Sequence, residues 1–294
     1  NKFVYWDSRI VEDTSTFDDQ NLTGTTFTIP SDMASGTYLL ECFFVGSYFQ
    51  IDSYTGNGAN RTLSFDSTLD TAPGFMVFHD RVDNGMEKLA YHESLGNGKF
   101  LQCEAASAAG TSATFLNSTS PTTTTFRLGT MDNVNKNTST YIMYAWANSA
   151  VYSFGDYTGN SNADGSFINV GGRPQAFCGK PTTSADSWLA KYDALLEYNV
   201  NGKRLYWEAT NAVSTSTSDG LVDFVSTGVK NRISSTGLNS STYGNYVYMA
   251  YGIQPLTDSA INQGRAGAVP PYDQAYGGNT IKRVGNFWVH TFTS

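Results

Sequence analysis

Charged residues are scarce in this chain, and basic residues are the scarcest of them. Only 15% of the residues are charged, with 18 Lys and Arg against 26 Asp and Glu, for a formal net charge of -8. Nucleic acids and anionic membrane surfaces are bound through clustered Lys and Arg, so we expect neither partner. Apolar runs are short as well, and none approaches the ~20 residues that span a bilayer, which argues against membrane insertion.

Sequence motifs of catalysis and of cofactor binding are absent. The chain has three histidines, His79, His92 and His290, and no two of them have the spacing of a local metal site. It contains no HExxH or CxxC motif, no Gly-rich phosphate-binding loop and no G-x-S-x-G nucleophile elbow. A Ser-His-Asp arrangement is compatible with the sequence, but no motif supports one. We therefore expect no enzyme activity, no cofactor and no bound metal.

Cysteine is rare too. Cys42, Cys103 and Cys178 form an odd set without metal-ligand spacing, and each lies in an apolar or mixed run. We predict buried free thiols, and one disulfide with a leftover thiol is the alternative.

Aromatic and small polar residues, by contrast, are abundant. The aromatic share is 14%, with 18 Tyr and 18 Phe, which is far from the composition of a disordered chain. Short aromatic and β-branched runs are broken about every ten residues by Gly, Asn, Ser or Pro. This spacing is typical of antiparallel strands in sandwiches and jelly rolls, so the sequence predicts an all-β fold.

The sequence also repeats itself after a little over one hundred residues. The motif Tyr-Thr-Gly-Asn occurs at residues 54–57 and again at 157–160. Other corresponding segments are 37–44, 140–147 and 246–253 (TYLLECFF, TYIMYAWA and YVYMAYGI), and 97–105 with 201–209 (NGKFLQCEA and NGKRLYWEA). The interval drifts only across Gly-, Ser- and Asn-rich stretches, as expected for loop insertions between fixed strands. We interpret Tyr-Thr-Gly-Asn as a structural joint, the turn at which each module begins.

These repeats predict tandem antiparallel β-sandwich modules. We assign 1–48 to the back half of a unit, 49–150 and 151–255 to two complete modules, and 256–294 to an extended C-terminal arm with a final strand. Half a sandwich exposes a sheet edge, so we expect the run after Thr280 or a neighbouring subunit to cover the first segment. The absence of an initiator Met favours another explanation, in which the chain is a fragment and the missing half lies upstream.

One segment has conflicting patterns. Residues 187–198 (SWLAKYDALLEY) carry apolar side chains at helical spacing. The corresponding stretch 88–99 (KLAYHESLGNGK) contains two glycines and does not resemble a helix. Because the repeat is the stronger evidence, we predict a strand followed by a turn.

Carboxylates are the candidates for catalysis. A glycosidase needs two of them flanking the scissile bond, and the candidate pairs are Glu87 with Glu93 and Asp193 with Glu197. Asp7, Glu93 and Asp193, however, occupy the same place in successive units. An acid repeated in this way is better explained by a structural role, such as hydrogen bonding to the backbone of a turn.

Two further features could bind ligands. Residues 160–165 (NSNADG) resemble the first half of a calcium loop, but Gly171 stands where the closing acid is needed, so a Gly/Asn turn is the better interpretation. Aromatic side chains can stack on sugar rings, and the candidates are Tyr54, Tyr157, Trp188, Trp207 and Trp288. In β proteins such residues more often belong to a core or an interface.

The order of motifs across residues 47–255 resembles tandem modules of virion structural proteins from tailed phages, notably marine and cyanobacterial ones. The resemblance rests on the Tyr-Thr-Gly-Asn-Gly turn at 54–58, YHESLG at 91–96, NSTSP at 117–121 and the closing strand YIMYAWA at 141–147. It implies lectin-like β-sandwich modules in a non-enzymatic particle component: a tail fibre, an appendage or a head decoration. The family brings no catalytic residues. GGRP at 171–174 departs from the usual Gly-Phe-x-Pro, and the C-terminal arm has no counterpart in the pattern.

From the sequence we therefore expect a virion structural protein that associates with itself or with other virion proteins and contacts a host surface, through a glycan for example. A carbohydrate-binding module and a cell-surface adhesin are the alternatives. A polysaccharide depolymerase is the least favoured interpretation, because it requires catalytic carboxylates in positions that the repeat explains structurally.

Overall fold

The computed structural model describes residues 22–23, 26–27, 41, 43–83, 85–193, 203–208, 221–234, 237–255, 280–284 and 287–291. Over these residues the protein is almost entirely β, and its large sheets are antiparallel, as the sequence predicts. The described helical elements are a single turn each, α1 (Asp132–Asn135) and the 3-10 turn η2 (Glu93–Leu95). The chain divides into two compact units, Asn1–Gln254 and Pro255–Ser294.

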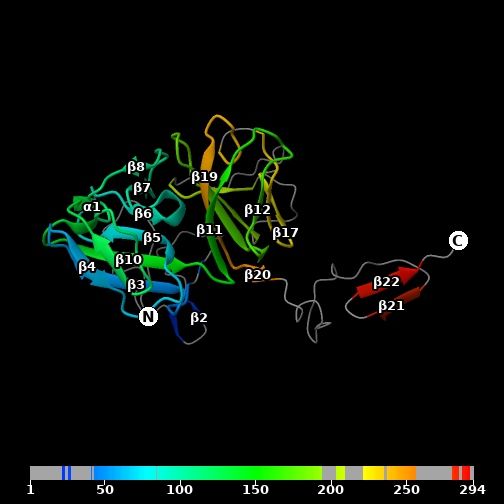
Figure 1. Ribbon diagram of the computed structural model, residues 1–294, viewed down its shortest axis with the longest axis horizontal. Coiled ribbons are helices and arrows are strands. Elements are labelled where there is room, and N and C mark those ends of the chain that lie inside the picture. The colour runs from blue at the N-terminus through cyan, green and yellow to red at the C-terminus, as the bar shows by residue number, and fades with distance from the viewer. Residues whose placement is uncertain are drawn as a thin grey trace. The chain divides into compact units, whose positions relative to one another are not determined.

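The first half of the larger unit contains a six-stranded sheet (Figure 1). Its strands, in spatial order, are β3 (Phe49–Thr55), β10 (Thr140–Ala147), β5 (Pro73–Asp80), β6 (Leu89–His92), β7 (Lys99–Gln102) and β8 (Gly110–Thr111). A separate pair is formed by β4 (Arg61–Ser64) and β9 (Thr125–Leu128).

The second half contains a five-stranded sheet with the matching strand order. Its strands are β11 (Tyr152–Thr158), β19 (Asn245–Tyr251), β14 (Ala176–Pro181), β15 (Leu189–Tyr192) and β16 (Leu205–Tyr206). A three-stranded sheet accompanies it, in the order β12 (Phe167–Asn169), β18 (Gly228–Asn231) and β17 (Val222–Val225). We call the two halves the first and second repeats. The strand that closes the sequence repeat has the same neighbours in both sheets. In the first repeat β10 lies between β3 and β5, and in the second β19 lies between β11 and β14.

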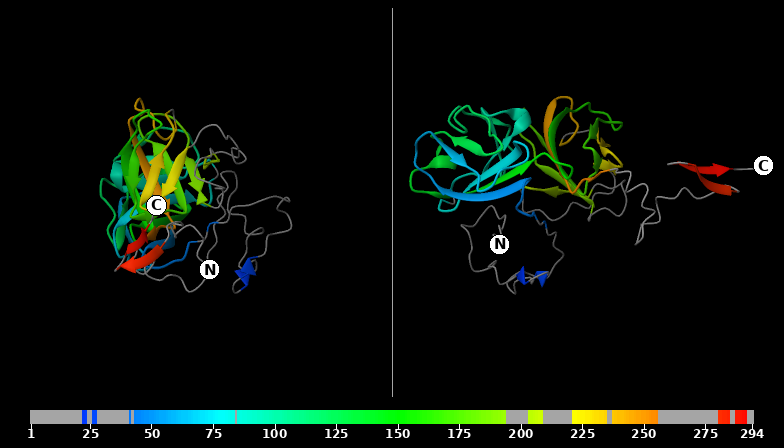
Figure 2. Two further views of the ribbon diagram at one scale, coloured as in Figure 1. Left: turned by 90° about the vertical axis from the view of Figure 1, so that its right-hand side faces the viewer. Right: turned by 60° about the horizontal axis from the view of Figure 1, so that its bottom comes forward.

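Short pairs complete the described structure, and Figure 2 shows two of them, β1–β2 in blue and β21–β22 in red. They are β1 (Leu22–Thr23) with β2 (Thr26–Phe27), β13 (Gly172–Arg173) with β20 (Gln254–Pro255), and, in the smaller unit, β21 (Thr280–Val284) with β22 (Phe287–Thr291).

Each large sheet buries both of its faces, because successive side chains of a strand point to opposite sides. In the first repeat, Met76 and Phe78 of β5 join a core beneath β4 and β9, while Phe75 and Val77 point the other way. The uninterrupted apolar runs of β5 and β10 match this burial on two sides. In the second repeat, a corresponding core lies between the five-stranded sheet and β12, β18 and β17.

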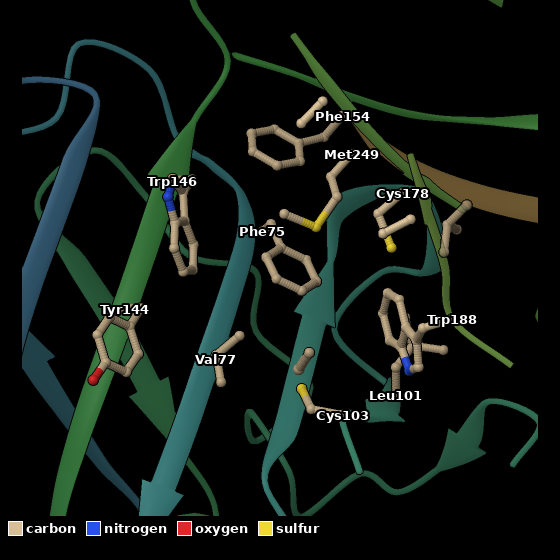
Figure 3. Close-up of a cluster of buried hydrophobic side chains, with 14 of the residues drawn as sticks. Phe75, Val77, Leu101, Cys103, Tyr144, Trp146, Phe154, Cys178, Trp188 and Met249 are labelled. Carbon is tan, nitrogen blue, oxygen red and sulfur yellow. The ribbon is translucent and has the colours of Figure 1, made fainter. Parts of the chain in front are cut away.

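A third core is shared by the two repeats, whose large sheets pack face to face. Phe75 lies at its centre, with ring centroids 5.7 Å from Trp146, 6.1 Å from Phe154 and 6.3 Å from Trp188. Figure 3 shows these side chains together with Met249 and the two buried thiols. The residues of this shared core from the first repeat are Phe49, Phe75, Val77, Ala90, Leu101, Cys103, Ile142, Tyr144 and Trp146, and those from the second are Phe154, Ala176, Cys178, Trp188, Ala190, Tyr192, Val247 and Met249.

Several local predictions are confirmed. The ambiguous segment forms strand β15 at Leu189–Tyr192, and residues 194–198 lie outside the described residues. The C-terminal run forms the hairpin β21–β22. Cys103 and Cys178 are buried free thiols, whereas Cys42 is outside the described residues.

Other predictions stay predictions. The arm at 256–279 lies outside the described residues, and so does most of the proposed half module at 1–48. Which segment covers the half module therefore stays a prediction. The module boundaries at 48, 150 and 255 are untested as well.

Candidate functional site

The first Tyr-Thr-Gly-Asn motif is held by a buried asparagine, Asn135, that lies 78 residues further along the chain. The backbone N–H of Asn57 donates to Asn135 Oδ1 at 3.0 Å. Asn135 Nδ2 donates to the carbonyl oxygens of Ala59, at 2.8 Å, and Gly129, at 2.7 Å. The hydroxyl of Tyr54 donates to the neighbouring carbonyl of Val134 at 2.7 Å.

The second motif is held in the same way by Asn239. The backbone N–H of Asn160 donates to Asn239 Oδ1 at 3.0 Å, and Asn239 Nδ2 donates to the carbonyls of Asn162 and Ile233, both at 2.8 Å. The hydroxyl of Tyr157 donates to the carbonyl preceding Asn239 at 2.8 Å. We call Asn135 and Asn239, with the turns they hold, the two asparagine latches.

Tyrosine stacking repeats along with the latches. Tyr54 lies opposite Tyr141 across β3 and β10, with ring centroids 5.1 Å apart and an interplanar angle of 13°. Tyr157 and Tyr246 make the equivalent pair at 5.1 Å and 12°. The sequence predicted that the motif is the turn at which each module begins. In the structure it lies at the end of the first strand of each repeat, β3 or β11. Its interpretation as a structural joint agrees with these contacts.

The stretch that resembles a calcium loop uses its oxygens inside the second latch. Asn160 Oδ1 accepts from the backbone N–H of Asn162, and Asn162 Oδ1 accepts from that of Asp164. The carboxylate of Asp164 pairs with Lys230 Nζ at 2.8 Å, which lowers the pKa of that carboxyl. These contacts are those of a Gly/Asn turn. Within the part of the chain that the structure describes, no group of three His, Cys, Asp or Glu side chains is placed to hold a metal ion.

Two of the candidate catalytic carboxylates, Glu93 and Asp193, have side-chain partners in the fold. Glu93, at the start of η2, accepts from Asn148 Nδ2 at 2.7 Å, and burial raises the pKa of Glu93. Asp193 pairs with Arg173 at 2.7 Å. The structural role predicted for these two acids therefore rests on side-chain partners, and the predicted hydrogen bond from each carboxylate to a turn's backbone is not among the contacts seen. Glu87 is exposed.

Asp7 and Glu197, the other acids named with them, are outside the described residues.

The aromatic candidates for sugar stacking contribute to packing. Trp188 and Tyr157 are buried. Trp207 is half-buried, and its ring stacks on Trp188 at 5.7 Å while its Nε1 donates to the hydroxyl of Tyr192 at 3.0 Å. Tyr54 is half-buried in the tyrosine stack described above.

The side chain of Trp288 is outside the described residues.

Two buried lysines of the second repeat were not predicted. Lys180 Nζ donates to the carbonyl of Asp186, and Lys191 Nζ donates to that of Val222 at 2.9 Å. Burial lowers the pKa of each lysine to about 8. The only sequence sign is that each lysine interrupts an apolar run, in AFCGKP and in WLAKY.

An exposed apolar feature lies at one edge of the shared core. Phe43 packs against that core, and its ring centroid is 6.4 Å from that of Tyr152. The next two residues, Phe44 and Val45, are 85% and 60% exposed, and Val151, beside Tyr152, is exposed as well. We call Phe44, Val45 and Val151 the apolar rim. Large apolar side chains left exposed beside a buried core are frequent at interaction sites.

Comparison with protein families assigns the two repeats to one domain. The model for a domain of unknown function, DUF7483, matches residues 45–255, more than two thirds of the chain. The chain belongs to the DUF7483 family. The DUF7483 domain includes both latches, the shared core and the outer core of each repeat, and it begins at Val45 of the apolar rim. Comparisons with curated proteins and with solved structures found no match.

The described part of the DUF7483 domain contains no helix with the length and apolar character of a membrane span. In the described part of the domain, Glu93, Asp193 and the oxygens of the Asn-rich turn bind other groups of the fold, and the most exposed large apolar side chain is Val45.

Proposed function

We propose that this protein is a non-catalytic structural protein of a tailed-phage particle, a tail fibre, an appendage or a capsid decoration, and that it associates with further copies of itself. The observation that carries the proposal is the apolar rim at the edge of a core that two repeats already share. Phe44 and Val45 follow Phe43, and Val151 precedes Tyr152; Phe43 and Tyr152 both pack against the shared core, so the rim residues lie directly beside it in the chain.

The contacts of the polar candidates support the non-catalytic part of the proposal. A glycosidase requires two carboxylates within about 5 to 9.5 Å of each other and free to exchange protons with a substrate. Glu93 and Asp193 instead bind an asparagine and an arginine of the fold. The phage assignment itself rests on the sequence resemblance, and the repeat architecture agrees with a protein built for assembly.

Self-association is tested on the full-length chain by sedimentation velocity over a wide concentration range, followed by electron microscopy of the largest species. We expect oligomers for the wild type and monomers for Phe44→Asp/Val45→Asp, since a charge at each position opposes burial of the rim. Val82→Asp is the matched control, because Val82 is a similarly exposed apolar residue outside the rim.

A wild type that remains monomeric at every concentration would contradict self-association, and so would a rim variant that assembles as the wild type does. The particle assignment is tested separately, with an antibody against the chain and phage lysates that encode it. Label on purified particles supports it, and label confined to the particle-free fraction argues against it.

A further inference from the structure

His92 lies between the two repeats. It ends β6 of the first repeat, is 1% exposed, and its ring lies edge-on to Phe75 at 6.1 Å and to Phe154 at 6.4 Å. Its Nε2 is 3.0 Å from the carbonyl oxygen of Tyr248, which belongs to β19 of the second repeat. A single imidazole therefore bonds one repeat to the other inside the buried contact. We call the whole buried contact between the two repeats the seam.

The two ring nitrogens of His92 have opposite hydrogen-bonding roles. Nδ1 accepts from the backbone N–H of Ser94 at 3.2 Å, where it caps η2. Nε2 faces a carbonyl, which only accepts, so Nε2 must carry the proton. Both bonds are satisfied by the neutral imidazole with its proton on Nε2. A second proton would sit on Nδ1 and oppose the N–H of Ser94, so the imidazolium loses one of the two bonds.

Few charges near His92 can compensate for protonation. Asp156 on β11 interacts favourably with the imidazolium, Tyr248 on β19 offers its carbonyl, and Glu93 on η2 is the adjacent acid, while β5 presents the apolar ring of Phe75. Burial outweighs the favourable contributions and lowers the pKa of His92 from 6.5 to about 4. In a state where the seam is open and the imidazole is hydrated, that pKa returns toward its ordinary value.

We propose that protonation of His92 opens the seam, so that the interface between the two repeats is acid-sensitive. This inference is independent of the proposed function. Two other bonds between the repeats, from Trp188 Nε1 to the carbonyl of Gln102 at 2.9 Å and from the N–H of Ala109 to the carbonyl of Thr182 at 2.9 Å, join groups that do not titrate.

The size of the effect follows from the two pKa values. With a closed-state pKa of about 4 and an open-state value near 6.5, full protonation favours the open seam by up to about 300-fold relative to neutral pH. The sign is fixed because the open state binds the proton more tightly. The closed seam is fully favoured above pH 6.5, and the advantage is lost progressively as the pH falls to 4.

The chain has its own reporters of seam opening. Cys103 and Cys178 are free thiols that face the shared core from the two repeats, each 1% exposed. We would measure their labelling on the full-length protein with dithiodipyridine, which reacts with thiols in acid, between pH 7.5 and 3.5. Mass spectrometry locates each label, and the rate is divided by that of a free model thiol. Hydrogen exchange of Phe126 and Val229, in the outer cores of the two repeats, reports global unfolding.

We expect labelling of both thiols to rise by about 150-fold at pH 4, where His92 is half protonated in the closed state, while the outer cores stay protected. His92→Gln should remove the rise, because Gln can make similar bonds and does not titrate. His79→Gln and Glu93→Gln are the matched controls, and both should behave as the wild type. The second control matters because Glu93 is adjacent to His92 and burial raises the pKa of its carboxyl.

The proposal is overturned if labelling is flat with pH, if it rises only together with exchange in the outer cores, or if Glu93→Gln and not His92→Gln removes it. Should His92→Gln fail to fold, an NMR titration of the wild-type imidazole provides the test. If His92 titrates with the same pH midpoint as the thiol labelling, the result supports acid-driven opening of the seam. Two separate midpoints refute it.

Discussion

Removing the side chain of Asn135 tests whether the latches are structural joints. Asn135 is fully buried, and it satisfies three backbone groups: the N–H of Asn57 and the carbonyls of Ala59 and Gly129. Asn135→Ala removes all three bonds together. Because Gly129 is a buried residue, water does not reach its carbonyl to replace the lost bond. The turn that follows the first strand then loses its attachment to α1.

The magnitude follows from the three bonds. Each contributes about 1 kcal/mol net, and a buried polar group left without a partner adds a desolvation penalty of about 1–3 kcal/mol. We expect Asn135→Ala to lower the free energy of unfolding by about 4–6 kcal/mol. Asn135→Asp should be at least as harmful at neutral pH, since a carboxylate oxygen would face two carbonyl oxygens where Nδ2 now donates.

Urea unfolding followed by tryptophan fluorescence and circular dichroism measures these changes. Asn60→Ala, an exposed asparagine of the same loop, is the control and should stay within about 0.5 kcal/mol of the wild type. Asn239→Ala should reproduce the loss in the second repeat, because Asn239 makes the same bonds. The reasoning fails if Asn135→Ala costs less than about 1 kcal/mol or if Asn135→Asp is as stable as the wild type.

Three further changes test the packing. A Cβ at Gly56 would lie 2.0 Å from a backbone carbonyl oxygen, whereas Gly98 has open space, so Gly56→Ala should lower the melting temperature by several degrees and Gly98→Ala should leave it nearly unchanged. Trp188→Phe removes the bond to the carbonyl of Gln102 and some buried volume, and calorimetry should show a loss of about 2–4 kcal/mol; a loss under 1 kcal/mol would contradict the shared core. Lys191→Met removes a buried amine with a pKa of about 8, whose charged form is penalised below that pH; the wild type should gain about 1–2 kcal/mol relative to the variant between pH 7.5 and 9.5 in urea titrations, and a constant difference would refute this.

The sequence by itself determined the features that depend on local pattern. Short aromatic runs between Gly and Asn turns predicted strands. The alternation of side chains along a strand and the conformation of a tight turn both depend on residues that are neighbours in the sequence. The same reasoning placed β15 at Leu189–Tyr192, where helical spacing competed with the repeat. The repeated Tyr-Thr-Gly-Asn also identified a joint, since only glycine tolerates the close backbone approach at Gly56 and at Gly159.

The tertiary structure decided which distant residues serve that pattern. Nothing near Asn57 in the sequence points to Asn135, and an asparagine in an Asn-rich chain gives no sign that it will be buried. Nor does the sequence say that the repeats pack face to face. The apolar runs of β5 and β10 require burial on two sides, but a partner layer is chosen by the packing of whole surfaces, such as Phe75 against Phe154. That choice buried His92 between the repeats, and a lone histidine in a sequence cannot reveal the carbonyl it will meet, 156 residues away.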